Sequence, residues 1–221
     1  MHVIVRIWDA PTRLFHWLLV ICFTGLLITA NLGGSAMVWH FRLGYTVFSL
    51  LLFRFFWGFL GGYWSRFATF LYSPSAMLHY VKGHSEPQQS VGHNPLGALS
   101  VFALLAFLSF QVASGLMSDD EISAAGPLTR FVSGDWVTFA TFYHKEIGKL
   151  VLLFLVATHL TAIGYYFFSK KDNLVSPMLK GDKTLSFNVP KSSDTSSDRA
   201  KAAFIFIVCA AFVTGLVSFL D

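Results

Sequence analysis

Long, uninterrupted apolar segments are the dominant pattern along this chain. Five of them reach the roughly 20 residues that an α-helix needs to cross a hydrocarbon core of ~30 Å. They lie at residues 12–30, 37–60, 95–117, 145–168 and 202–220. A soluble core would instead alternate apolar and polar positions at helical or strand spacing. The pattern therefore predicts an all-α protein with five transmembrane helices.

The third segment has the clearest start signal. Asn94 belongs to the residue types that cap helices, and Pro95 suits the first helical position, where its missing N–H costs nothing. The first segment follows basic residues, as the apolar part of a signal peptide does. Its length and its polar His16 favour a retained helix instead.

The composition agrees with a membrane protein. Of 221 residues, 54% are hydrophobic and 13% are charged, whereas about one-quarter of the residues in a soluble domain are charged. The net charge of +4 comes from basic residues beside the apolar segments, so nucleic-acid binding has no support. Cys22 and Cys209 lie within apolar segments and are predicted to be small buried hydrophobes.

The distribution of Lys and Arg predicts the orientation, because these residues concentrate in cytoplasmic loops. Basic residues lie at the start of the first segment, between the second and third segments, and between the fourth and fifth. They are Arg6, Arg13, Arg66, Lys82, Lys170, Lys171, Lys180, Lys183, Lys191, Arg199 and Lys201. The connection between the third and fourth segments is acidic instead, with Asp119, Asp120, Glu121 and Asp135 against Arg130. We therefore expect a multi-pass membrane protein with a cytoplasmic amino terminus.

Four histidines lie within the predicted helices, where ionisable groups are costly and usually functional. By depth, His16 matches His159 near the cytoplasmic side, and His40 matches His144 near the outer side. His144 and His159 are 15 residues apart, which is ~22 Å along a helix axis. One tetrahedral metal ion cannot gather all four imidazoles. Two separate cofactors, stacked across the membrane, can use them in pairs.

Two b haems suit these pairs, because such an iron takes one axial nitrogen from each side of its ring. Gly44 and Gly148 each follow a histidine by four residues and are predicted to leave room for the ring at the outer pair. Two alternatives remain open. A single histidine near a helix end can sit at headgroup level, and hydrogen bonding between helices can explain one pair.

Three arginines are the main candidate partners for the propionate groups of haem, which are carboxylates: Arg13, Arg42 and Arg54. Arg66 is a further candidate. For Arg13, Arg42 and Arg66, anchoring at the membrane interface is an equally good interpretation. Arg54 lies further inside its segment. His93, just before the third segment, is expected to be a surface loop histidine rather than a ligand.

Several motifs together resemble the bacterial cytochrome b561 family, which includes the b-type cytochrome subunits of nickel-iron hydrogenases. The match is carried by VRIWDAPTRLFHW (5–17), HFRLGY (40–45), FRFFWGFLG (53–61), GHNPLGALS (92–100), SGLMSDDEI (114–122) and the helix from His144 to His159. The resemblance covers roughly residues 3–180. It implies that residues 1–180 form a transmembrane four-helix bundle binding two b haems, in the bacterial inner membrane. It also implies that His16, His40, His144 and His159 are the axial ligands of the haem iron.

Two regions follow this predicted core. Residues 181–201 are rich in Ser, Asp and Lys and are expected to be a flexible, polar, cytoplasmic linker. Residues 202–221 are expected to form an additional C-terminal transmembrane helix.

The predicted function is electron transfer across the membrane between quinone and a redox partner such as a c-type cytochrome. A first alternative is a subunit or catalytic component of a membrane oxidoreductase, either hydrogenase-type or superoxide-oxidising. A second is a proton or metal transporter built on the same histidines, although the segments lack midplane Asp or Glu partners. The expected partners are the lipid bilayer, quinone and a redox protein, and a second copy of the chain is a further candidate.

Overall fold

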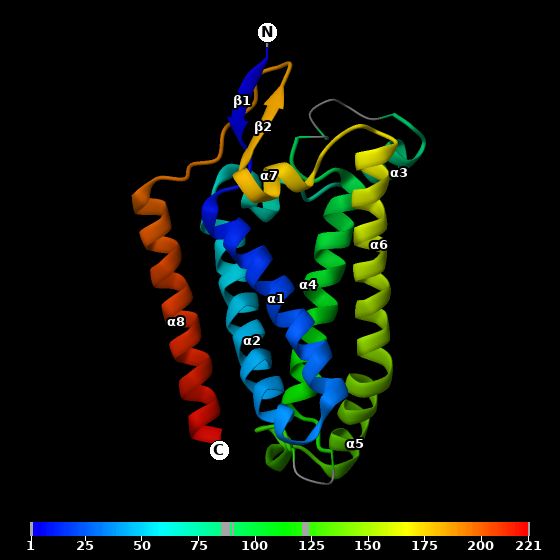
Figure 1. Cartoon of the computed structure of the whole chain (residues 1–221), viewed down its shortest axis with the longest axis vertical. Coiled ribbons are helices and arrows are strands. Elements are labelled where there is room, and N and C mark those ends of the chain that lie inside the picture. Colours follow the sequence, from blue (N-terminus) through cyan, green and yellow to red (C-terminus); the bar gives the residue numbers. More distant parts are fainter. Residues whose placement is uncertain (1, 85–88, 90, 121–123, 221) are drawn as a thin grey trace. The chain divides into compact units, whose positions relative to one another are not determined.

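The computed structural model describes residues 2–84, 89, 91–120 and 124–220. Glu121 of the predicted acidic connection lies outside this part of the chain. The elements follow one another along the chain (Figure 1) as β1 (Val3–Arg6), α1 (Ala10–Leu32), η1 (Gly34–Ala36), α2 (Met37–Leu60), η2 (Tyr63–Ser65), η3 (Phe67–Thr69), α3 (Pro74–Val81), α4 (Pro95–Leu116), η5 (Thr129–Phe131), α5 (Gly134–Phe142), η6 (Tyr143–Gly148), α6 (Lys149–Phe168), α7 (Val175–Lys180), β2 (Asp182–Leu185) and α8 (Ser196–Leu220).

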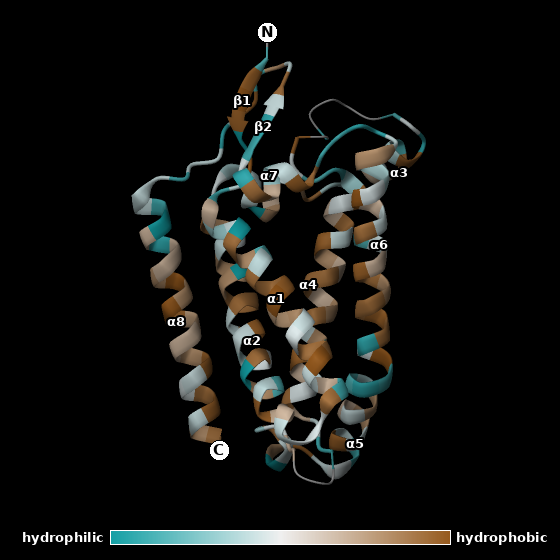
Figure 2. Ribbon diagram, viewed as in Figure 1, coloured by the Kyte–Doolittle hydropathy of each residue, from teal (hydrophilic) through white to brown (hydrophobic). Residues whose placement is uncertain are grey.

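In the described part of the chain, five helical stretches are long and apolar enough to cross a membrane, which confirms the predicted fold class. They are α1, η1 with α2, α4, the run from α5 through α6, and α8. Figure 2 shows that apolar residues dominate these helices. Large apolar side chains such as Phe110, Phe154 and Phe219 are exposed on them, so lipid suits this surface better than water. Cys22 and Cys209 are buried and unpaired by disulfides, as predicted.

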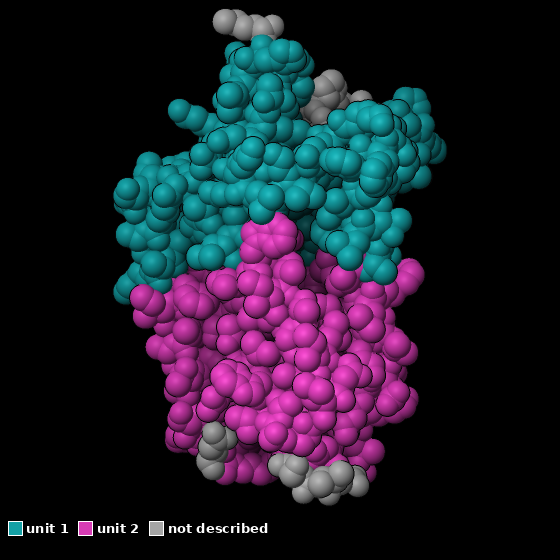
Figure 3. Space-filling model, in the orientation of Figure 1, with its two compact units in different colours: residues 1–15, 54–103, 157–204 teal, residues 16–53, 104–156, 205–221 magenta. Residues whose placement is uncertain are grey.

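The chain forms two compact units, coloured separately in Figure 3. Unit 1 comprises residues 1–15, 54–103 and 157–204, and unit 2 comprises residues 16–53, 104–156 and 205–221. Each unit therefore contains pieces of several long helices, and each is described below by itself.

Helix α4 starts where the sequence predicts. The Asn94 side-chain oxygen accepts a hydrogen bond from the Gly97 backbone N–H at 2.7 Å, which satisfies one of the donors left free in a first helical turn. The Asn94 amide nitrogen donates to the Tyr166 hydroxyl at 2.7 Å. The cap is thus held by α6 within unit 1.

The fourth predicted helix is longer and less regular than its apolar pattern indicates. Helix α5 continues into α6 through η6, a stretch of π-helix that contains His144. A π turn holds more residues than an α turn. Positions on either side of it therefore do not share the faces that α-helical spacing predicts.

Residues 181–201 do not form the flexible linker that their polar composition predicts. Strand β2 pairs antiparallel with β1, with Val3 opposite Leu185 and Arg6 opposite Asp182. Ser192 is buried, and its hydroxyl donates to the Ile7 carbonyl at 2.6 Å. The prediction is wrong because these polar residues find partners on the amino-terminal segment, far away in sequence.

Asp194 accepts hydrogen bonds from two arginines of unit 1. Its carboxylate lies 2.6 Å from Arg6 Nη1 and 2.9 Å from Arg199 Nε. Burial raises the pKa of this carboxyl, but the hydrogen bonds from Arg199 and the Ala10 backbone, with the charges of both arginines, outweigh burial and hold the pKa below its usual value. The hydrogen bond to Asp182 raises the pKa of Arg6.

Asp9 is fully buried before α1 and joins three parts of unit 1. Its carboxylate accepts from the Thr12 N–H at 2.8 Å, the Gly62 N–H at 2.9 Å, the Ser65 hydroxyl at 2.7 Å and the Trp57 indole N–H at 3.2 Å. Four donors compensate the cost of burying a charge. Asp9 therefore caps α1 and fixes the turn after α2.

Candidate functional site: a paired-imidazole centre

The structure brings two of the four predicted histidines together. In unit 2, the rings of His40 on α2 and His144 in η6 have centroids 6.2 Å apart and planes at 83°. Both side chains are half-buried. This contact agrees with the predicted pairing of His40 and His144.

The other predicted pair is divided between the two units. His16 on α1 belongs to unit 2, where its ring meets Trp17 edge-on at 5.1 Å, whereas His159 on α6 belongs to unit 1. Both are half-buried. Their pairing stays a prediction.

The His40 ring is held from α1. Its Nδ1 atom lies 3.2 Å from the Leu26 carbonyl oxygen and 3.2 Å from the Thr29 hydroxyl oxygen. When Nδ1 carries the proton, the Leu26 carbonyl accepts it, because a carbonyl has no proton of its own. The opposite ring nitrogen, Nε2, then has a free lone pair.

The His144 ring is held from α4 in the same manner. Its Nδ1 atom lies 2.9 Å from the Gln111 carbonyl oxygen and 3.3 Å from the Ser114 hydroxyl oxygen. The Gln111 side chain also donates to the His144 carbonyl at 2.9 Å. A β-carbon at Gly115 would lie 2.7 Å from Cε1 of the ring, so only glycine lets the imidazole lie this close to α4.

This geometry fits two axial ligands of one iron. Metal–nitrogen bonds of ~2 Å on each side, with half an imidazole ring beyond each nitrogen, place two ligand centroids ~6 Å apart. The observed separation is 6.2 Å. Each Nδ1 has a carbonyl acceptor from a neighbouring helix, the arrangement that usually orients a metal-ligating histidine. The residues present therefore fit a haem at this site.

The two predicted spacer glycines differ in their surroundings. A β-carbon at Gly44 would meet no atom within 4 Å, whereas one at Gly148 would overlap the Gln111 side-chain oxygen. Gly148 thus makes room for Gln111, and the interpretation of it as haem space is not supported by its contacts. The i+4 argument fails there because Gly148 ends the π-helical stretch.

Arg54 is the most enclosed of the predicted arginines, with 4% of its surface exposed. Its Nη2 donates to the Ser65 carbonyl at 3.0 Å, and its guanidinium lies 4.5 Å from the Phe67 ring centre. Within the described residues, Nη1 has no hydrogen-bond partner. A buried guanidinium nitrogen in this condition suits a carboxylate ligand.

Arg13 and Arg42 have other partners. Arg13 Nη1 donates to the Leu179 carbonyl at 2.6 Å, and Nη2 lies 3.9 Å from Asp194. Arg42 is exposed, with its guanidinium 5.1 Å from the Trp39 ring centre. The exposure of Arg42 suits interfacial anchoring, whereas Arg13 is held by groups of the protein itself.

His93 is not the surface loop histidine that we expected. In unit 1 its ring centroid lies 4.7 Å from that of Trp8 and 4.6 Å from that of Phe70, and its carbonyl accepts from the Tyr72 hydroxyl at 2.9 Å. Aromatic packing on both sides explains its partial burial.

Sequence reasoning did not identify the residues that hold the two rings: Thr29, Gln111, Ser114 and Gly115. A weak signal existed for three of them. Ser114 and Gly115 open the motif SGLMSDDEI, and Gln111 is a polar amide within an apolar segment. That Gln111, Ser114 and Gly115 contact the His144 ring depends on the π-helical stretch, which sets the direction of that side chain.

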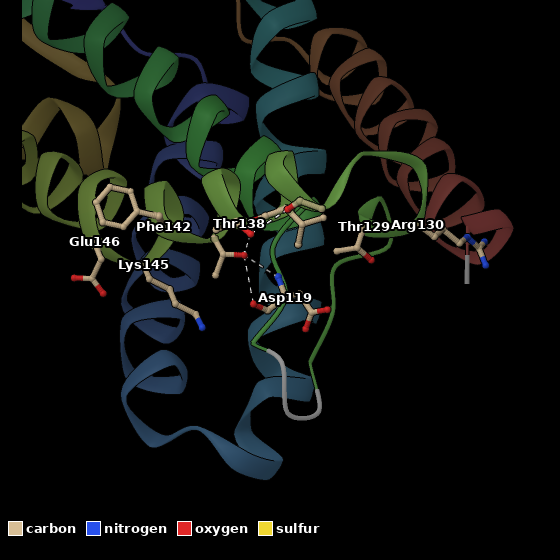
Figure 4. Close-up of a pocket in the computed structure, with 10 residues that line it drawn as sticks. Asp119, Thr129, Arg130, Thr138, Phe142, Lys145 and Glu146 are labelled. Carbon is tan, nitrogen blue, oxygen red and sulfur yellow. Dashed lines mark hydrogen bonds between the residues drawn. The ribbon is translucent and has the colours of Figure 1, made fainter.

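An open pocket of about 670 Å³ lies beside η6 in unit 2 (Figure 4). It is lined by Asp119, Thr129, Arg130, Gly134, Val137, Thr138, Thr141, Phe142, Lys145 and Glu146. Two cations and two carboxylates therefore line the same pocket, and two of these four charges, Lys145 and Glu146, come from η6.

Comparison with known proteins places most of the chain in one family. The profile of the family described as prokaryotic cytochrome b561 matches residues 7–181. This range contains the four candidate histidines and the three candidate arginines. No solved structure gives a significant match to the chain.

Several curated proteins are similar to the chain at low identity. A probable Ni/Fe-hydrogenase B-type cytochrome subunit of Bradyrhizobium diazoefficiens is 25% identical, over 81% of this chain and 85% of that protein. The one from Azotobacter vinelandii is 27% identical, over 80% of this chain and 87% of that protein. A probable Ni/Fe-hydrogenase 1 B-type cytochrome subunit of Escherichia coli is 24% identical, over 53% of this chain and 61% of that protein.

Proposed function

The chain belongs to the prokaryotic cytochrome b561 family, and on this premise we propose that it binds two b haems and passes electrons between quinone and a redox protein. Membership makes it a membrane b-type cytochrome of electron transfer. Three points go beyond family membership and are our proposals: that two haems are bound, that quinone is one electron partner, and that a redox protein is the other.

The observation that carries the proposal is the His40–His144 contact. The two imidazole centroids are 6.2 Å apart, and each Nδ1 lies beside a backbone carbonyl, so the Nε2 atoms would be the ones to hold a haem iron. A bound haem supplies a reversible one-electron couple. His40 and His144 hold the metal, and the carbonyls of Leu26 and Gln111 keep the rings in the required tautomer.

His16 and His159 are the proposed ligands of the second haem. Both lie in membrane-spanning helices, where ionisable side chains are costly and usually functional. The His144-to-His159 spacing of ~22 Å supports a separate site at another depth. Two such sites would suit electron movement across a bilayer.

Arg54 is the proposed partner of a haem propionate. Its buried Nη1 lacks a partner within the described residues, and a propionate oxygen would supply one with opposite charge. Arg13 and Arg42 remain candidates for the same role. Within the described residues, Arg13 Nε is also buried without a hydrogen-bond partner, whereas Arg42 is exposed.

The proposed location is the bacterial inner membrane, with a cytoplasmic amino terminus. The support is the concentration of Lys and Arg in residues 1–13, 61–94 and 169–201, against the mixed charges of residues 117–133. Labelling of a cysteine introduced at Lys191 by a membrane-impermeant reagent tests this. Labelling in intact spheroplasts would overturn the orientation.

A basic c-type cytochrome is the proposed external electron partner. Asp119 lines the pocket beside η6, Asp120 follows it in the sequence, and opposite charges accelerate such encounters. Raised ionic strength should slow reduction of this partner by the chain. A rate independent of salt would reject the steering role of these acids.

A hydrogenase-type complex is the second candidate function. The observation that favours it is the set of relatives, which are probable Ni/Fe-hydrogenase B-type cytochrome subunits. Copurification of a catalytic subunit would support this candidate.

Two further proposals have their own tests. Superoxide-dependent turnover by the isolated chain would favour a superoxide-oxidising enzyme. The mass of the purified particle tests whether the chain forms a homodimer.

The decisive experiment is a reduced-minus-oxidised visible spectrum with a haem-to-protein ratio. We expect b-type bands and a ratio of two. A well-folded preparation that stays colourless when supplied with haem would overturn the proposal and leave the histidine-based proton or metal transporter as the alternative. A ratio of one would reject the second haem, and loss of the remaining haem in His40→Ala would assign it to the His40–His144 site.

A further inference from the structure

The two rings of the His40–His144 site are held by one repeated arrangement on two different helices. In each case a carbonyl and a hydroxyl three residues apart face the ligand Nδ1, namely Leu26 with Thr29 on α1 and Gln111 with Ser114 on α4. Residues three apart are neighbours on one helix face. The two hydroxyls, however, send their protons to different acceptors.

On α1, the hydroxyl is an additional acceptor for the ligand. Thr29 Oγ1 donates its single proton to the Gly25 carbonyl at 2.8 Å, a shorter contact than its 3.2 Å separation from the Leu26 carbonyl. Its lone pairs are then available to the His40 Nδ1–H at 3.2 Å. Two acceptors share that proton, which increases the electron density on the imidazole.

On α4, the hydroxyl competes with the ligand. Ser114 Oγ donates to the Gln111 carbonyl at 2.9 Å, the same oxygen that accepts His144 Nδ1–H at 2.9 Å. A carbonyl that already accepts a hydroxyl proton is a weaker acceptor for the next donor. Ser114 Oγ itself lies farther from Nδ1, at 3.3 Å, so its main effect reaches the ligand through the carbonyl.

We propose that Thr29 and Ser114 are positioning residues that tune this site in opposite directions. Thr29 strengthens electron donation by His40, and Ser114 weakens donation by His144. An electron-rich imidazole stabilises ferric iron, so Thr29 lowers the reduction potential of the haem and Ser114 raises it. The inference rests on the proposed function, because it requires a haem between the two rings.

The test is potentiometric titration of the full chain in detergent, with the couple assigned by its loss in His40→Ala. Thr29→Val should raise the midpoint potential and Ser114→Ala should lower it. We expect each to change the reduction equilibrium constant by up to about tenfold, or ~59 mV for one electron. The other couple should not move.

Matched controls exist on the same two helices. Thr24 donates to the Val20 carbonyl at 2.9 Å, and Ser109 donates to the Leu105 carbonyl at 2.8 Å, both on exposed faces. Thr24→Val and Ser109→Ala should leave both potentials unchanged. Thr29→Ser restores the hydroxyl and should keep the wild-type potential.

The outcomes separate the inference from the proposed function. Absence of haem in the wild-type protein defeats the proposed function. With haem bound, three results would overturn the tuning role. The midpoint potential could shift equally in the control variants, shift in the same direction in Thr29→Val and Ser114→Ala, or not shift at all. Should Thr29→Val lose this haem while Thr29→Ser keeps it, the positioning role is supported, and loss in both variants contradicts it.

Discussion

The guanidinium of Arg6 meets both carboxylate oxygens of Asp182, with Nε at 2.6 Å and Nη2 at 3.2 Å. The two residues are 176 positions apart and lie opposite each other in the β1–β2 ladder. A paired fork of this kind fixes geometry as well as charge. Together with the contact between Arg6 and Asp194, this ion pair holds the segment before α8 against the amino-terminal strand.

Acid should weaken this connection through Asp194. The folded-state pKa of its carboxyl is lowered, so its stabilising contribution is present above the ordinary value of about 4 and is lost as pH falls through the lower folded value. Thermal unfolding in detergent should show reduced stability on this acidic limb.

Asp194→Asn provides the comparison. This substitution should lower the free energy of unfolding by about 1–3 kcal/mol at neutral pH, because an amide replaces a charged acceptor of two arginines. It should also reduce the loss of stability that the wild-type protein shows at acidic pH. An unchanged acidic limb in this variant would show that other carboxyls cause the loss.

Asp9→Asn should destabilise unit 1 more than exposed carboxylate substitutions do. The amide cannot accept from all four buried donors, so a cost of about 2–3 kcal/mol is expected. Asp135→Asn, at an exposed position of α5, is the control and should be neutral. Equal melting temperatures for the two variants would contradict this prediction.

Ligand substitutions should remove haem one site at a time. We expect His159→Ala to abolish the His16–His159 haem and largely spare the other, and His40→Ala to do the reverse, because each iron uses ligands from its own pair. The haem-to-protein ratio should fall from two to one in each case. If either substitution emptied both sites while the chain stayed folded, the pairing would be incorrect.

Gly115→Ala should disturb the His40–His144 site specifically. The new methyl group would lie 2.7 Å from His144 Cε1, which forces the ring away from Gln111. We expect loss of that haem or a changed spectrum with little change in helix content. Gly215→Ala, on α8 with no atom within 4 Å of the new carbon, is the control and should retain both haems.

Hydropathy by itself predicted the five spanning helices, because segment length and apolar content decide whether a helix suits a bilayer. The Asn94 cap was equally predictable, since it depends on residues three positions apart. The sequence also singled out His40 and His144 as a pair. Local patterns were sufficient for each of these features.

Tertiary structure decided the features that depend on distant partners. The segment 181–201 is ordered because Arg6 and Ile7 supply acceptors and donors that composition does not reveal. The role of Thr29 depends on which face of α1 meets His40 on α2. The roles of Ser114 and Gly115 depend on which face of α4 meets the π-helical stretch. Hydropathy is a property of single segments, whereas such contacts depend on the relative rotation of two helices, which only packing determines.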